Sequence, residues 1–265
     1  MSPVINWEVR GPVGLATLDR PERRNALSAE MCRQLREHLA EHRSLRAVVL
    51  TGAGSAFCAG ADLGHTPLSV SGDTPSPGRE DEFRPAFEAL LDEVVDHPAP
   101  VIAAVNGPAL GGGTQLVVAC DLRVAAHEAT FGIPATQLGV MLSPENIQRL
   151  ALLVGQAHAR DLLLTGRRIG VGEALRMGLV HRLADDALAA GLDLAGEIAA
   201  MAPLTVAGHK AALNAVARHM GYTRGEDDEL IGELDALVAQ AFASDDLKEG
   251  LAAFSEKRPP DFAGH

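Results

Sequence analysis

Aromatic residues and cysteines are scarce in this chain of 265 residues. Aromatic side chains make up only 3% of the sequence, with one tryptophan and one tyrosine. Proteins that stack nucleic-acid bases need more such platforms, so the composition argues against that class. The three cysteines, Cys32, Cys58 and Cys120, are odd in number and form no CxxC pair, which indicates neither a disulfide framework nor a zinc ribbon. We expect free thiols that behave as small buried apolar residues in a reducing compartment.

An excess of positive charge and long apolar runs are also missing. The formal net charge is −12, which argues against a nucleic-acid partner because phosphate binding needs concentrated lysine and arginine. No apolar run reaches the roughly 20 residues of a membrane span. Residues 1–8 lack the basic and apolar regions of a signal peptide. These features predict a cytoplasmic protein with one large core, or a core plus a helical appendage.

Apolar periodicity predicts short strands and helices up to residue 143 and mostly helices after it. A hairpin is expected at 4–10 and 13–18, with buried strands at 47–51, 101–105 and 122–126. Ser28 is the expected N-cap of a helix to about Arg43, and a second helix surrounds 83–94. Later helices are expected at 144–154, 157–164, 171–177, 186–201, 203–219, 226–243 and 245–254. This pattern alone indicates α/β or α+β.

One segment, 65–79, is rich in serine, glycine and proline. It is expected to be a surface loop, either a mobile lid over a binding site or an inert insertion.

Two glycine-rich stretches, Phe57–Leu63 and Gly107–Leu116, carry most of the chemical information. Small residues let a backbone N–H reach a ligand without screening by side chains. Two such N–H groups can form an oxyanion hole, although tight packing of glycine turns is the alternative. The segment 52–57 lacks the third glycine of a dinucleotide fingerprint, and 107–114 lacks the lysine of a P-loop.

Both stretches, with Cys120-Asp-Leu-Arg-Val124 behind the second, resemble the paired signatures of the crotonase (enoyl-CoA hydratase/isomerase) superfamily. The resemblance runs from about residue 4 to residue 262. It implies an α/β fold, a crotonase-like ββα spiral over 1–200, followed by a helical region over 201–265 that assembles trimers or hexamers. It also implies a coenzyme A thioester as ligand, no covalently bound cofactor, and the N–H groups of Ala59 and Gly112 as donors to the thioester oxygen.

The resemblance further implies three coenzyme-binding segments. Arg23 and Arg24, in the segment that includes Ala26, are expected to meet phosphates, although a solvated basic turn is the alternative for either arginine. The backbone of Ala61, Asp62 and Leu63 would face the adenine, and Asp62 is also expected to orient its loop. Lys257, near the end of the chain, would reach the coenzyme of a neighbouring subunit.

The chain departs from the family where a hydratase places its two glutamates. Those positions are Gln115 and Ala135 here, and a positioned acid or base contributes typically 10²–10⁴-fold. The sequence therefore predicts an acyl-CoA-binding protein of lipid metabolism, nominally a lyase, without hydratase activity. The alternative is an isomerase, thioesterase or decarboxylase that uses Glu145, itself equally readable as a first-turn charge of a helix. Ser143 lacks an adjacent base and is a poor nucleophile.

A further motif, His38-Leu-Ala-Glu41-His42, matches the H-x-x-E-H pattern of one metalloprotease class. It places two histidines on one helical face. No additional ligand is evident in the sequence, so no metal site is expected.

Overall fold

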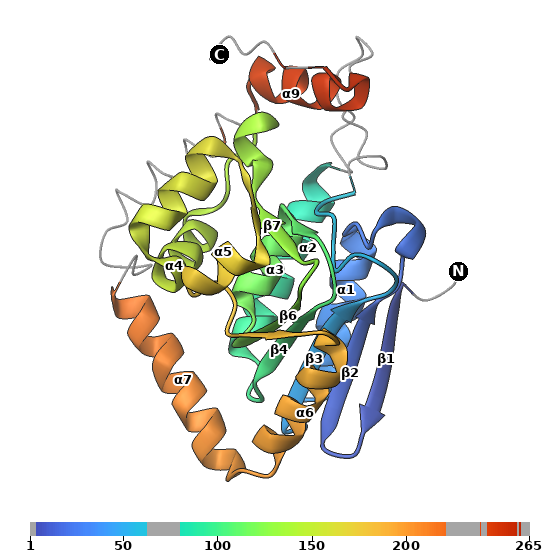
Figure 1. Cartoon of the computed structure of the whole chain (residues 1–265), viewed down its shortest axis with the longest axis vertical. Helices are drawn as coiled ribbons and strands as arrows, with labels where there is room; N and C mark the ends of the chain where they lie inside the picture. The colour runs from blue at the N-terminus through green and yellow to red at the C-terminus, as the bar shows by residue number, and fades with distance from the viewer. Residues whose placement is uncertain (1–3, 63–79, 221–238, 240–242, 259, 261–265) are drawn as a thin grey trace.

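The computed structural model describes residues 4–62, 80–220, 239, 243–258 and 260 (Figure 1). Its main sheet has six strands in the order β1-β2-β3-β4-β6-β9. The first two strands pair antiparallel and the others parallel. The strands are β1 (Ile5–Arg10), β2 (Val13–Leu18), β3 (Ala47–Gly52), β4 (Val101–Val105), β6 (Leu122–Ala126) and β9 (Arg182–Ala184).

Helices cover both faces of this sheet. The crossovers α1 (Ala29–Glu41) and α2 (Glu80–Asp96) bury their apolar stripes against one face, and α6 (Ala187–Ala199) covers the other, where it contacts β3, β4 and β6. Parallel strands covered on both faces need apolar residues at every position. This explains why β3 and β4 are buried along their whole length and why their unbroken apolar runs could be predicted as strands.

The molecule contains a second, smaller sheet of three strands. It consists of β5 (Ala109–Leu110), β7 (Thr130–Gly132) and β8 (Arg168–Gly170). These strands are two or three residues long, too short to show a period, and the sequence did not predict them. Helix α3 (Gly112–Ala119) follows β5 directly.

Helices dominate the second half, as expected. Helix α4 (Pro144–Thr165) is interrupted at Gly155, whose φ of 76° and ψ of 155° are not helical, so it consists of two helical segments, as predicted for 144–154 and 157–164. The short α5 (Val171–Arg176), α7 (Pro203–Met220) and α9 (Asp245–Glu256) also match predicted ranges. The expected helix 226–243 lies almost wholly outside the described residues. Figure 1 shows α7 running along the side of the molecule and α9 at its top.

Helix α7 is fixed to the core by polar contacts. The buried Lys210 Nζ donates to Asp121 Oδ2 at 2.7 Å and to the carbonyls of Val94 and Ala99. Asn214 donates to the Val95 carbonyl at 2.7 Å. Three apolar side chains of this helix are exposed: Leu204, Leu213 and Val216, at 89%, 69% and 54%.

No single helix in the described part of the chain is long and apolar enough to cross a membrane. The pair 187–199 and 203–217 passes a test of length and composition only when taken together, and it is bent by 109°.

Candidate functional site

Helix α3 begins at Gly112, whose backbone N–H meets no acceptor among the described residues. The residue before it is fixed, because the Gly111 N–H donates to the Gly132 carbonyl at 2.8 Å. The Thr114 hydroxyl is buried between the carbonyls of Ala109 and Gly132, at 2.6 and 3.0 Å. The first N–H groups of a helix have no partner within it, and the helix dipole makes this end positive. The scaffold therefore presents the Gly112 N–H to anything that carries developing negative charge.

The first glycine-rich stretch packs directly on this helix end. The Cys58 carbonyl accepts from the Leu110 N–H at 2.9 Å. A Cβ added at Gly113 would lie 2.4 Å from the same carbonyl, a distance that no side chain tolerates. Gly113 is thus required for close approach of the two stretches, which is the packing role given above as the alternative for these glycines.

The Ala59 N–H, predicted as an oxyanion donor, is already bonded within the chain. It donates to the Arg24 carbonyl at 2.9 Å. The structure contradicts the donor role for Ala59, because a backbone carbonyl rather than open space lies in front of its N–H.

The Ala61 N–H is better placed than the Ala59 N–H to act as an oxyanion donor. Leu27 and Ala61 form a parallel bridge, in which the Leu27 N–H donates to the Gly60 carbonyl and the Asp62 N–H to the Leu27 carbonyl. The Ala61 N–H itself points away from Leu27, and within the described residues no acceptor takes it. A Cβ built on Gly60 would lie 3.6 Å from the Gly112 nitrogen. The Gly60–Ala61 peptide therefore lies beside the start of α3.

Apolar side chains surround the start of α3 at Gly112. A Cβ at Gly112 would lie 3.4 Å from the Phe87 ring and 3.5 Å from a Leu27 methyl group. Next to it lies a narrow recess with no internal space large enough for a water molecule. It is lined by Gln115, Val118, Ile133, Asn146, Arg149 and Leu150. Gln115 is half-buried one helical turn after Gly112, so the position of the first missing glutamate faces a pocket.

The other candidate acid–base positions do not line this pocket. Ala135 lies in the 3-10 helix η2 (Pro134–Gln137), half-buried against the core. Glu145 lies in the first turn of α4, the position that the alternative interpretation gives it. Ser143 is the buried residue before α4. The structure brings Ala61, Gly112 and Gln115 together, whereas Glu145 lies outside the residues that form the pocket.

The predicted coenzyme-binding arginines are exposed. Arg23 ends the 3-10 helix η1 (Pro21–Arg23), and Arg24 follows in a left-handed conformation, with φ of 50°. Within the described residues, neither guanidinium is paired with a carboxylate. Ala26 is buried, and its carbonyl accepts from Arg20 at 2.8 Å.

The remaining residues predicted to contact the coenzyme differ in their surroundings. Asp62 is buried, and its carboxylate pairs with Arg20 at 2.7 Å, consistent with the expectation that it orients its loop. Leu63 and the segment 65–79 lie outside the described residues. Lys257 is exposed at the end of α9.

The cysteines are buried, as expected. Burial raises the pKa of Cys58 and of Cys120 to about 12. Neither thiol forms the nucleophilic thiolate near neutral pH, which excludes Cys58 as a nucleophile despite its place beside the site.

A family model described as enoyl-CoA hydratase/isomerase matches residues 8–265. The chain belongs to this family. The "Probable enoyl-CoA hydratase echA6" of Mycobacterium tuberculosis (strain CDC 1551 / Oshkosh) is 40% identical over 253 residues, which cover 93% of this chain and 94% of the relative. The enoyl-CoA hydratase EchA19 of M. tuberculosis (strain ATCC 25618 / H37Rv) is 38% identical over 261 residues, which cover 96% and 94%.

Solved structures agree with this membership. An enoyl-CoA hydratase/isomerase from Pseudoalteromonas atlantica T6c aligns with a TM-score of 0.82 and 33% identity, over 98% of this chain and all of that one. A methylmalonyl-CoA decarboxylase in complex with 2-nitronate-propionyl-CoA aligns with a TM-score of 0.85 and 25% identity, over 99% of both chains. The predicted crotonase-like fold and an acyl-CoA-related function are thus confirmed for this enoyl-CoA hydratase/isomerase family member.

Some residues of the site were missed from the sequence. Ala61 was predicted only as an adenine contact, and Phe87, Asn146 and Arg149 were not predicted at all. The apolar period of α2 marks Phe87 as buried, but no local signal tells which buried residue borders a site.

Proposed function

We propose that this chain binds acyl-CoA thioesters and does not hydrate enoyl-CoA. The observation that carries the proposal is the pairing of Ala61 and Gly112. Their N–H groups lie beside each other and meet no acceptor in the described part of the chain, and Gln115 stands next to them instead of a carboxylate. The donors suit a thioester oxygen, for which removal of one oxyanion donor typically costs about 3–4 kcal/mol.

The proton-transfer half of a hydratase has no counterpart in the described site. Gln115 cannot exchange a proton near neutral pH, and Ala135 has no polar group. None of the residues that line the adjoining pocket is a carboxylate. The second candidate, an active isomerase, thioesterase or decarboxylase that uses Glu145, has no support from the placement of that side chain.

The coenzyme would lie over the segments that Arg20 and Asp62 hold together. Arg23 and Arg24 are exposed and can meet phosphates, while the overall charge of −12 makes such a local cation pair necessary. Ala26, Ala61, Asp62 and Leu63 form the remainder of the proposed coenzyme contact.

Assembly into trimers or hexamers, through the region 201–265 rather than the 1–200 core, is part of the same proposal. Leu204, Leu213 and Val216 of α7 are exposed apolar residues that a second copy would cover. Lys257 would then reach the coenzyme of the neighbouring copy. Light scattering after gel filtration tests this, with Leu213→Glu expected to yield monomers.

Calorimetric titration with crotonyl-CoA and a long-chain acyl-CoA, paired with a hydration assay on crotonyl-CoA, tests the proposed function. Saturable binding without turnover is the expected result. Robust hydration would refute the loss of activity, and no binding of any CoA thioester would overturn the whole proposal. Glu145→Gln should change neither measurement, whereas lost turnover in that variant would establish the second candidate.

A further inference from the structure

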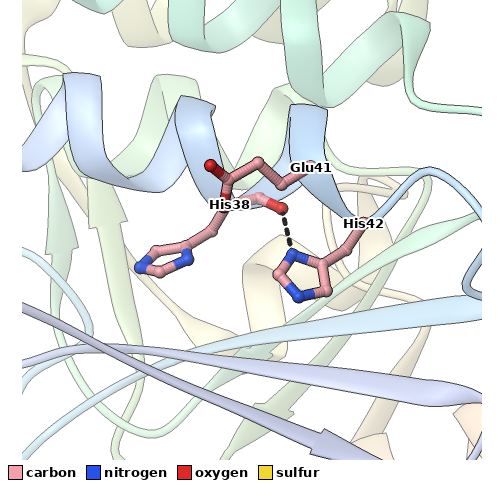
Figure 2. Close-up of side chains that lie close together, drawn as sticks. All are labelled: His38, Glu41 and His42. Atoms are coloured by element: carbon pink, nitrogen blue, oxygen red, sulfur yellow. Dashed lines mark hydrogen bonds between the residues drawn. The ribbon is translucent and has the colours of Figure 1, made fainter.

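Three potential metal ligands meet at the far end of α1 from the acyl-CoA site. His38, Glu41 and His42 occupy positions i, i+3 and i+4 of the helix, which lie on one face. One ring nitrogen of each histidine and one carboxylate oxygen of Glu41 lie within 4.8 Å of one another. Figure 2 shows the two imidazoles side by side below the helix, with Glu41 above them.

The tautomer of His42 suits metal binding. Its Nδ1 lies 2.8 Å from the His38 carbonyl (Figure 2). A carbonyl only accepts, so this Nδ1 carries the proton and the lone pair is on Nε2. Histidines that bind metals commonly donate their other ring N–H to a backbone carbonyl, which fixes the tautomer and orients the ring.

His38 has an unmet need for a partner. Its Nδ1 is buried, and within the described residues no hydrogen bond reaches it. A buried polar atom without a partner costs free energy, and a bound cation would remove that cost. The ring is half-buried and stacked on Trp7, with centroids 5.2 Å apart and planes 7° apart.

Trp7 of β1 supports both imidazoles. The His42 centroid lies 4.9 Å from it, and the two histidine centroids are 6.3 Å apart. An apolar wall on one side and solvent on the other gives the cluster a partly desolvated, open shape. Metal binding there needs movement of side chains only, because ligand atoms around tetrahedral zinc lie roughly 3.3–3.5 Å apart.

We propose that His38, Glu41 and His42 form a binding site for Zn²⁺. Two imidazoles and a carboxylate are ligands that this ion accepts, and three protein ligands leave a fourth position for water. The site is separate from the acyl-CoA site: α1 has 13 residues, so its ends are about 20 Å apart. The ion would hold the end of α1 in one arrangement against β1.

Trp7 provides a direct readout because it is the only tryptophan of the chain. Untagged full-length protein would be titrated with Zn²⁺ in a calorimeter and with Co²⁺ in a fluorimeter. One-to-one Zn²⁺ binding and saturable quenching of tryptophan emission by Co²⁺ are expected. His42→Ala and Glu41→Gln should weaken Zn²⁺ binding, by about tenfold or more for the histidine.

His38→Phe separates ligation from packing, since it retains an aromatic ring against Trp7 but no ligand atom. It should also lose Zn²⁺ binding while it keeps its melting temperature in the absence of metal. The matched control is His127→Ala, an exposed histidine outside the cluster, which should leave the stoichiometry and affinity unchanged. No Zn²⁺ binding by the parent protein, or binding by His38→Phe and His42→Ala that is as tight as that of the parent, would overturn the proposal.

Discussion

Arg20 and Asp62 form an ion pair that ties the two halves of the candidate site together. The Arg20 Nη2 lies 2.7 Å from Asp62 Oδ2, and the side chains are 15% and 6% exposed. The same guanidinium donates to the Ala26 carbonyl at 2.8 Å. Arg20 therefore links the segment that carries Arg23 and Arg24 to the turn that carries Ala61.

Replacing Asp62 by alanine should leave the Arg20 cation buried without its partner. We expect a loss of about 3 kcal/mol in the free energy of unfolding and a clear loss of acyl-CoA affinity, because the neighbouring Ala61 N–H loses its support. Urea unfolding and calorimetry would measure both. Arg10→Ala, which breaks an exposed pair with Glu8, is the control and should cost under about 1 kcal/mol. Equal effects from the two variants would contradict the coupling.

Gly113→Ala should damage the site more than its size suggests. The new methyl group would lie 2.4 Å from the Cys58 carbonyl, so the start of α3 must shift and carry the Gly112 N–H with it. We expect overpacking to cost about 1–3 kcal/mol and acyl-CoA binding to fall at least about tenfold. Gly196→Ala in α6 meets nothing within 4 Å and should stabilise the protein by about 0.5–1 kcal/mol. A Gly113→Ala protein that binds normally would show that the two stretches are not in contact.

Restoring both glutamates should create hydratase activity. The double variant Gln115→Glu, Ala135→Glu supplies an acid and a base at the two positions where the resemblance places the glutamates of a hydratase. Each group contributes typically 10²–10⁴-fold, and groups that act as a unit are not additive, so the double variant should exceed either single variant by about 10²-fold in hydration of crotonyl-CoA. Binding of a saturated acyl-CoA serves as the control for intact folding. Activity of the parent protein equal to the double variant would contradict the proposed loss.

Stability should fall as the pH drops below neutrality, through His97. This histidine is fully buried, and burial lowers its pKa below the usual 6.5. Near pH 6.5 the imidazole of the unfolded chain therefore binds a proton, whereas the buried imidazole of the folded chain stays neutral. The free energy of unfolding is unaffected by this histidine above that pH and decreases as the pH falls below it. The slope is at most about 1.4 kcal/mol per pH unit for one histidine.

Urea unfolding between pH 5 and pH 8 measures this slope, and His97→Asn should flatten it. A slope that persists unchanged in the variant would assign the effect to other groups.

The sequence predicted the elements whose burial repeats over several turns or strand residues. Unbroken apolar runs gave β3 and β4, and the three- and four-residue spacing gave α1 and α2. It could not give β5, β7 and β8, because two or three residues show no period and these strands exist only through pairing with distant partners.

The first oxyanion donor was predicted at Ala59 rather than Ala61 for a similar reason: the choice depends on contacts with distant residues. Ala59, Gly60 and Ala61 are all small, so any of their N–H groups could face a ligand. Only the Arg24 carbonyl, from another part of the chain, removes Ala59 from consideration. The absence of a glutamate at Gln115 and Ala135 could be predicted from the sequence, because it depends on which residue is present and not on where its side chain lies.

Hydrogen bonds from Lys210 and Asn214 hold helix α7 against the core, while its Leu204, Leu213 and Val216 side chains are exposed. Directional hydrogen bonds fix the rotation of a helix about its axis, which apolar packing would leave freer. The outward face is therefore preorganised, and whatever covers Leu204, Leu213 and Val216 meets a surface that needs little further ordering. Lys210→Met should thus weaken the proposed association by loosening the helix, although Lys210 itself is buried against the core.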